Sequence, residues 1–221
     1  MNRYESYKDH DVRWLNKIPS HWKVQPLWSL SKKKSITENR GLELLSVYLN
    51  KGVIKFSDVS DKRTNTTSDD MSKYQRVDSG DLVLNNQQAW RGSVGVSSYT
   101  GIVSPAYIVL EMSKELDREY SNYLFRDGVM VAHYLTCSKG VGSIQRNLYF
   151  PDLRTTPVII PPLEEQKLIS RYLDQKTSQI DLLVEKLREK TNLIKEGILN
   201  YCYESEIKKT KLNSHATCWF Q

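Results

Sequence analysis

Between residues 42 and 160, short apolar runs alternate with turn-forming residues. The runs include LLSVYL, GVIKF, GDLVLN, GSVGVSSY, GIVSPAYIVLEM and TPVIIP, which are bounded by Gly, Asn, Asp or Pro. Such runs, rich in β-branched residues, are typical of short strands. The stretch KELDREYSNYLFRDGVMVAHYLTCS, residues 114–138, instead repeats its apolar residues at helical spacing. The pattern therefore predicts a sheet domain that a helix interrupts.

The hydrophobic period changes after Pro161 and Pro162 to a seven-residue repeat. Proline suits a helix start because no amide partner is needed there, and the carboxylates of Glu164 and Glu165 suit the positive helix end. A repeat sustained over about four heptads is typical of a coiled coil. The predicted pairing face, called the seam below, consists of Leu173, Thr177, Ile180, Val184, Leu187, Thr191, Ile194, Ile198 and Tyr201.

The predicted helix covers residues 163–207, and the last residues, 208–221, have no period and predict an irregular tail. At 1.5 Å per residue the helix is roughly 65–70 Å long. A small domain cannot cover this length, so we expect the seam to pair with another helix. The alternative is an amphipathic helix folded back onto the sheet domain. The narrow stripe, with threonine at two seam positions, favours the coiled coil.

Charge is unevenly distributed along the chain, whose formal net charge is +6. Residues 1–162 contain 22 basic and 17 acidic residues, whereas residues 163–207 contain seven basic and nine acidic ones. A basic domain favours a polyanionic partner such as nucleic acid. Three widely spaced cysteines, without a CxxC pair or a secretory leader, predict a reducing, cytoplasmic location. No apolar stretch reaches the roughly 20 residues of a membrane-spanning helix, so we expect no membrane association.

Sequence motifs for catalysis are missing. The chain contains no GxxxxGK[ST] phosphate loop, no GxGxxG dinucleotide fingerprint and no GxSxG nucleophile turn. Its four histidines are scattered without the spacing of metal ligands. We therefore expect a protein without a catalytic centre, and without a metal or cofactor of its own.

Two polar stretches contain side chains suited to contacting DNA. In LVLNNQQAWRGSVG, Asn and Gln can bond bidentately to adenine and Arg to guanine, although a hydrogen-bonded turn explains the four amides equally well. In SKGVGSIQRNLY, glycines would let the backbone approach a phosphate closely, and a plain connecting loop is the alternative. The candidate DNA-contacting residues are Asn86, Gln87, Gln88, Arg91, Lys139, Ser143, Gln145 and Arg146.

A run of three lysines, Lys32-Lys33-Lys34, lies near the start of the sheet domain. Such a run would suit a backbone phosphate. Charge runs are more often solvated surface, and this is the interpretation that we adopt.

Four ordered stretches resemble one protein family. They are IPSHWKVQPL, GDLVLNNQQAWRGSVGVSSYTGIVSPAYIVL, GVGSIQRNLYFPDLRTTPVIIPPLEEQKLISRYLD and the helix that follows, over residues 12–207. They resemble the specificity subunit of type I restriction-modification systems. The resemblance implies an α+β fold, with a target recognition domain of mixed sheet and helix over residues 1–160 and a long coiled-coil helix over residues 161–207. It also implies a domain that reads half of a bipartite DNA site and a helix that docks methyltransferase subunits.

One departure from the family pattern concerns copy number. Family members have two recognition domains and two helices, whereas this chain has one of each and no internal repeat. It resembles a half-length subunit, so we expect a homodimer, or a pair with another half subunit, formed through the helix. A two-fold pair would read an inverted repeat with a spacer.

The resemblance also implies partners and leaves one alternative. The partners are double-stranded DNA, methyltransferase subunits that carry S-adenosylmethionine, and a restriction or translocase subunit. The alternative is a coiled-coil adaptor, or a truncated remnant, that no longer reads DNA and acts only in protein assembly. Salt dependence of DNA binding would distinguish the two, since a reader that neutralises phosphates loses affinity as salt rises.

Overall fold

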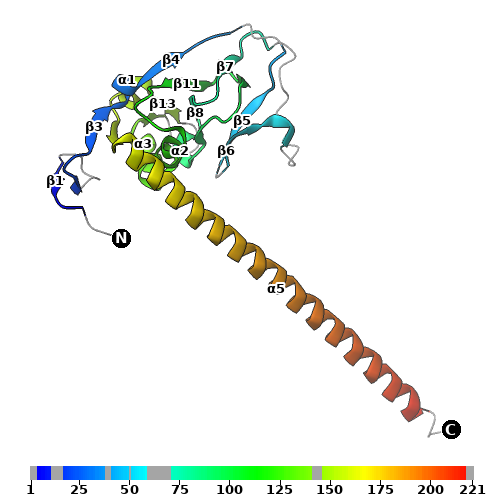
Figure 1. Cartoon of the computed structure of the whole chain (residues 1–221). Coiled ribbons are helices and arrows are strands. Elements are labelled where there is room, and N and C mark those ends of the chain that lie inside the picture. Colours follow the sequence, from blue (N-terminus) through cyan, green and yellow to red (C-terminus); the bar gives the residue numbers. More distant parts are fainter. Residues whose placement is uncertain are drawn as a thin grey trace. The chain divides into compact units, whose positions relative to one another are not determined.

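The computed structural model describes residues 4–10, 17–37, 41–49, 51–58, 71–140 and 146–217. Contacts divide the chain into two units, residues 1–170 and residues 171–221. The first unit contains the strands and the short helices, and the second contains most of the long helix α5, Leu163–Thr217 (Figure 1). The predicted domain limit after residue 160 stays a prediction.

A four-stranded antiparallel sheet organises the first unit. Val109 of β11 (Tyr107–Met112) pairs with Lys34 of β4 (Ser31–Lys34) on one side and with Val83 of β8 (Leu82–Asn85) on the other. Three of the strands come from the predicted runs GDLVLN, GSVGVSSY and GIVSPAYIVLEM. In spatial order the strands are β4, β11, β8 and β9 (Val94–Val96).

Smaller antiparallel strand pairs and short helices complete the first unit. The pairs are β1 (Tyr7–Asp9) with β2 (Lys17–Pro19), β3 (Lys23–Pro26) with β14 (Pro157–Ile160), β5 (Leu45–Tyr48) with β6 (Gly52–Lys55), β7 (Gln75–Val77) with β10 (Gly101–Val103), and β12 (Ser138–Lys139) with β13 (Asn147–Leu148). The helices are α1 (Leu27–Leu30), α2 (Arg118–Arg126), α3 (Gly128–Thr136), α4 (Phe150–Leu153) and the 3₁₀ turns η1 (Phe56–Asp58) and η2 (Ala89–Arg91). The β3–β14 pair places the N-terminal segment beside the strand that precedes α5.

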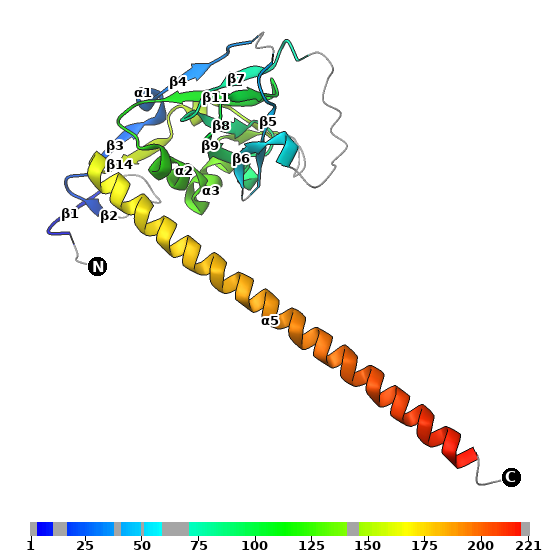
Figure 2. The ribbon, with the colours of Figure 1, turned by 45° about the vertical axis from the view of Figure 1, so that its right-hand side comes forward.

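Both faces of the central sheet are covered by apolar side chains. Successive side chains of a strand point to opposite faces, so one strand contributes apolar residues to both faces. Leu82 and Leu84 of β8 lie in one buried cluster with Phe125 of α2 and Tyr134 of α3. Figure 2 shows these two helices together on one side of the strands. Val83, between the two leucines, lies in a second cluster with residues of β5, β7 and β10. Burial of each such side chain stabilises the fold by about 1.5–3 kcal/mol.

The stretch predicted as one helix folds as two, α2 and α3, which meet at Asp127. The backbone of Asp127 is extended, and its carboxylate accepts a hydrogen bond from the amide of Val129 at 2.8 Å. This bond caps α3, since the first amides of a helix have no partner within it. Asp117 caps α2 in the same way, through the amide of Tyr120 at 3.0 Å.

Gln166 anchors the first turns of α5 within the first unit. This side chain is fully buried. Its Oε1 accepts a hydrogen bond from the amide of Asp117 at 2.7 Å, and its Nε2 donates to the carbonyls of Glu115 at 2.9 Å and Pro161 at 2.8 Å. Buried amides need such partners at both ends. The change of period after Pro161 and Pro162 therefore marks an anchored helix start.

Glu165, the preceding residue, binds the N-terminal segment. Its carboxylate accepts hydrogen bonds from Trp22 Nε1 at 2.9 Å and from the Tyr4 hydroxyl at 3.2 Å, and His21 Nε2 lies 2.6 Å away. Burial alone would raise the pKa of Glu165, but the hydrogen bonds from Trp22 and His21 outweigh it and lower that pKa below its usual value. The start of α5 is thus held by two neighbouring side chains with different partners.

Helix α5 continues to Thr217, beyond the predicted end at residue 207. Residues 208–217 are therefore helical, which corrects the prediction of an irregular tail from residue 208. In the second unit Ile180 is 58% exposed, Leu187 55% and Ile198 58%. Of the remaining seam residues, Val184, Thr191 and Ile194 are exposed, Leu173 is half-buried, and the side chain of Tyr201 lies outside the described residues.

The two seam threonines bond their hydroxyl groups within the helix. The hydroxyl of Thr177 donates to the carbonyl of Leu173 at 2.9 Å, and the hydroxyl of Thr191 donates to that of Leu187 at 2.7 Å. Such bonds to the preceding turn satisfy the hydroxyl within its own helix. Threonine is therefore compatible with an apolar pairing face.

Leu182 and Leu193 of α5 lie away from the seam. Leu182 is 53% exposed and Leu193 is 68% exposed. At 3.6 residues per turn, both fall on the side of the helix opposite the seam residues Val184 and Thr191. The heptad pattern did not predict this second apolar position.

Candidate nucleic-acid interface

The first polar stretch forms a tight turn after β8. The side-chain Oδ1 of Asn85 accepts a hydrogen bond from the amide of Gln87 at 3.0 Å, and Trp90 Nε1 donates to the carbonyl of Gln87 at 2.9 Å. The turn ends at Gly92, whose φ of +98° lies in the left-handed region that favours glycine. The interpretation as a hydrogen-bonded turn thus applies to Asn85. Gln87 is exposed and Gln88 is half-buried, and their contact with DNA stays a prediction.

Arg91 is exposed and stacks on its neighbour Trp90. The centre of its guanidinium lies 4.6 Å from the centre of the indole ring. An arginine held against an aromatic ring loses less freedom when its N–H groups bind a partner. Those N–H groups lie in the guanidinium plane and match the two acceptors of guanine. Sequence reasoning named Arg91 but gave Trp90 no role.

Asn86 joins the first polar stretch to the second. Its carbonyl accepts a hydrogen bond from the amide of Leu148, in β13, at 2.9 Å. Its side-chain Oδ1 is buried and has no hydrogen-bond partner among the described residues. The structure therefore brings the two predicted stretches together at one place, which their separation in the sequence did not indicate.

The second stretch contains four predicted DNA-contacting residues, and the structure describes two of them. Lys139 is exposed, with its Nζ 3.5 Å from the centre of the Tyr149 ring and 3.4 Å from Asp152 Oδ2. Its charge is therefore partly neutralised. Arg146 is half-buried and immediately precedes β13. Ser143 and Gln145 lie outside the described residues, so all four stay predicted DNA contacts.

The lysine run divides between surface and interior. Lys32 and Lys33 are exposed, as the interpretation of solvated surface requires. The interpretation is wrong for Lys34. This side chain is buried, and its Nζ lies 2.7 Å from Asp78 and 2.6 Å from Asp81. The hydrogen bond from Lys34 lowers the pKa of Asp78, whereas burial raises the pKa of Asp81. Lys34 is thus part of an internal ion-pair network.

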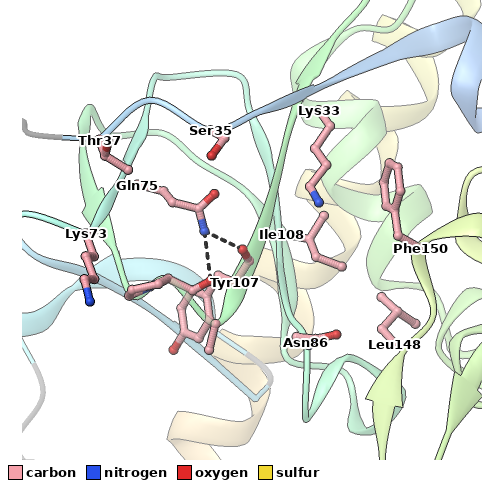
Figure 3. Close-up of a pocket in the computed structure, with 12 residues that line it drawn as sticks. Lys33, Ser35, Thr37, Lys73, Gln75, Asn86, Tyr107, Ile108, Leu148 and Phe150 are labelled. Atoms are coloured by element: carbon pink, nitrogen blue, oxygen red, sulfur yellow. Dashed lines mark hydrogen bonds between the residues drawn. The ribbon is translucent and has the colours of Figure 1, made fainter.

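A hollow of about 570 Å³ opens beside Lys33. The carbonyl of Ile36 accepts from the amide of Arg76 at 2.8 Å, so the segment after β4 runs beside β7 and the hollow lies between these elements and β11. Figure 3 shows Lys33, Asn86 and Phe150 on one side of it, and Lys73 and Gln75 on the other. The sequence did not indicate a role for Lys73 or Gln75, because polar residues between predicted strands show no periodicity or motif.

The amide of Gln75 is fixed at the wall of this hollow. Its Nε2 donates to the carbonyl of Pro105 at 3.1 Å and to that of Tyr107 at 2.7 Å. The side chain is almost fully buried. It therefore holds the start of β11 against β7 and shapes the hollow from within.

The described part of the chain gives little support for a metal site or a reactive thiol. No cluster there combines three His, Cys, Asp or Glu side chains that could hold a metal ion. His133 Nε2 lies 3.5 Å from Cys137 Sγ, but burial lowers the pKa of His133 and raises that of Cys137. Both shifts favour the neutral forms and oppose a reactive thiolate. None of the described helices has the length and apolar character needed to cross a membrane.

Comparison with known families defines the class of this protein. A profile of the type I restriction modification DNA specificity domain matches residues 19–193. This match covers most of the chain, and the chain therefore belongs to this family. It is a DNA-recognition domain of a type I restriction-modification specificity subunit, as the sequence motifs predicted.

A solved structure confirms the predicted α+β fold with a long helix. That structure, described as the structural basis underlying complex assembly and conformational transition of the type I R-M system, has a TM-score of 0.50 and 19% identity, covering 75% of this chain and 40% of that one. The HsdS subunit from Thermoanaerobacter tengcongensis has a TM-score of 0.44 and 17% identity, covering 75% and 40%. The type I S subunit from M. genitalium has a TM-score of 0.47 and 16% identity, covering 75% and 41%. This chain thus spans less than half of each solved chain.

Proposed function

We propose that this chain reads one half of a bipartite site in double-stranded DNA and so positions methyltransferase subunits on it. One observation carries the proposal: the bond between Asn86 and Leu148 gathers two polar stretches at one place. Base contacts would come from Gln87, Gln88 and Arg91 in the turn after β8, where amides and a guanidinium can match base edges. The family of the chain and its basic first unit support this reading.

In this proposal the chain recognises the DNA site, and its partner subunits catalyse the reactions on the DNA. Methyltransferase subunits bind S-adenosylmethionine and transfer the methyl group, and a restriction or translocase subunit joins the same complex. The chain binds no cofactor and supplies no catalytic side chain. The complex acts on DNA in the cytoplasm.

Helix α5 is proposed to pair with a second copy of itself, or with the helix of another half subunit. Its seam is exposed and apolar, and two of its threonines bond their hydroxyls internally. A pair with two-fold symmetry would place two readers on inverted half-sites, with the helices setting the spacer between them.

The exposed apolar residues of α5 also favour a second function. A helix with Ile180, Leu187 and Ile198 exposed could serve protein assembly alone. In that case the chain would be an adaptor that docks partner subunits without reading DNA. The two functions differ in whether the first unit contacts a polyanion.

Salt dependence separates the reader from the adaptor. The affinity of duplex DNA for the methyltransferase subunits is measured with and without the chain, over a range of salt concentrations. A reader that neutralises several phosphates adds affinity that falls steeply as salt rises. An adaptor leaves the affinity and its salt slope unchanged, and this result would remove the reading function.

A further inference from the structure

Two neighbouring hollows on the first unit share the residues Lys33 and Phe150. The first, of about 570 Å³, includes Lys73 and Asn86 in its wall. The second, of about 290 Å³, includes Trp28 and Arg154 in its wall. Lys33 Nζ lies 4.9 Å from the centre of the Phe150 ring, so these two side chains form a ridge between the hollows. Together the hollows and the ridge make one continuous surface, called the track below.

The charge of the track is positive and uncompensated. Its walls contain Lys32, Lys33, Lys73 and Arg154 and no aspartate or glutamate. None of these four forms an ion pair with a carboxylate of the described residues. Glu111 lies opposite Lys32 in the β4–β11 pairing, which leaves the other three as the main charges. Basic groups gathered without acidic partners attract a polyanion.

Two other lysines of the chain are paired with carboxylates, unlike the basic residues of the track. Lys34 has two aspartate partners within 3 Å, at 2.7 and 2.6 Å, and Lys55 lies 3.0 Å from Glu43. The alternation of β4 sends Lys34 to its aspartates and Lys33 to the track. Adjacent lysines of one strand therefore differ in kind, one structural and one available for a ligand.

The form of the track favours an extended ligand. Two hollows on either side of a ridge suit a chain of phosphates better than one isolated anion. The walls also contain the hydroxyl residues Ser35 and Thr37, and hydroxyl groups donate to phosphate oxygens. Asn86 lines the first hollow and also begins the turn that carries Arg91, so the track lies next to the predicted base-reading residues.

We propose that the track binds the phosphodiester backbone of double-stranded DNA, with Lys33 at its centre and Lys73 and Arg154 on either side. The proposal rests on the reading function proposed above and adds a site that fixes the register of the reader. Phosphate contacts position a protein on DNA without selecting sequence. The track therefore contributes affinity, and the turn after β8 contributes the choice of bases.

The test measures binding of the full chain to mixed-sequence DNA duplexes by fluorescence anisotropy, over a range of salt concentrations. Lys33→Ala and Lys73→Ala each remove one phosphate contact, so the slope of log K against log salt becomes shallower by about 0.9. At 0.1 M salt this corresponds to binding about eight-fold weaker, equally for duplexes of different sequence. Lys33→Arg keeps the charge and retains the wild-type slope.

A matched control is Lys167→Ala. Lys167 is paired with Glu164 at 2.8 Å in the first turn of α5. Lys167 lies in the wall of neither hollow of the track. This variant removes the same charge elsewhere and should bind as the wild type does. Thermal melting of each variant verifies that the fold is intact.

The possible outcomes separate the track from the reading function. Wild-type slopes for Lys33→Ala and Lys73→Ala, with DNA binding otherwise retained, overturn the track and leave the reader. Weaker binding to one sequence only also overturns it, since that result indicates base contacts. Failure of the wild-type chain to bind any duplex removes both proposals together.

Discussion

At the residue scale, the turn after β8 separates side chains that hold the backbone from side chains that face outward. Asn85 and Trp90 both bond to the backbone of Gln87, while the side chains of Gln87 and Arg91 are exposed. Changes at the exposed positions would alter base preference and leave the turn intact. In the proposed reading function, this division would let one turn present different side chains to the bases.

Gln166 is the residue whose loss should affect stability most directly. Gln166→Ala removes one acceptor and one donor group, leaving the amide of Asp117 and the carbonyls of Glu115 and Pro161 without that partner. Each buried group that loses its partner costs about 1–3 kcal/mol, so we expect the free energy of unfolding to fall by about 3 kcal/mol. Urea unfolding, followed by circular dichroism, measures this change.

Gln175→Ala is the control for this prediction. Gln175 lies on the same helix but is exposed. Its replacement should change the free energy of unfolding by less than about 0.5 kcal/mol, as for most surface positions. Equal stability of Gln166→Ala and Gln175→Ala would show that the Gln166 contacts do not anchor α5.

Residue types alone could predict some of the candidate site. Arg91, Gln87 and Gln88 were named as candidates because donors and acceptors can be recognised from the sequence, and their contact with DNA stays a prediction. The different fates of Lys33 and Lys34 could not be predicted, since they depend on the register of β4 against β11 and on an aspartate pair far along the chain. Local sequence does not contain that register.

At the element scale, periodicity predicted the strands and the long helix but not where helices end. The break at Asp127 depends on a capping carboxylate, which the spacing of apolar residues does not reveal. The extension of α5 to Thr217 has a different reason. Adding a residue to an existing helix gains a hydrogen bond without a new nucleation cost, so a helix can continue through a polar segment that has no period.

The seam of α5 can be tested against the opposite side of the same helix. Leu187→Glu places a charge on the predicted pairing face, and burying two such charges in a pair is unfavourable. We expect light scattering to give twice the chain mass for the wild type and the single mass for this variant. Leu182→Glu introduces the same change on the opposite side and should keep the double mass.

Two results would contradict self-pairing through the seam. A wild-type chain with the single mass at all concentrations would show that the chain does not pair with itself. A double mass for Leu187→Glu would place the pairing face elsewhere on the chain. Either result would favour another half subunit, or another face, as the partner of α5.

At the scale of the whole molecule, the chain has one predicted recognition domain and one long helix. The chain spans about 40% of the length of the solved specificity-subunit chains that it resembles. The family and the fold class could be predicted from ordered motifs, because these lie along one chain. The proposed partner of α5 could not, since an exposed apolar face does not show what would cover it.

The most direct test of the reading function is selection from a random duplex DNA library by the chain together with its methyltransferase subunits. If the chain reads half of a bipartite site, the selection recovers two fixed half-sites separated by a constant spacer, as inverted copies if the chain pairs with itself. Bound DNA without any enriched sequence, or no DNA retained beyond that held by the methyltransferase alone, would contradict the reading function.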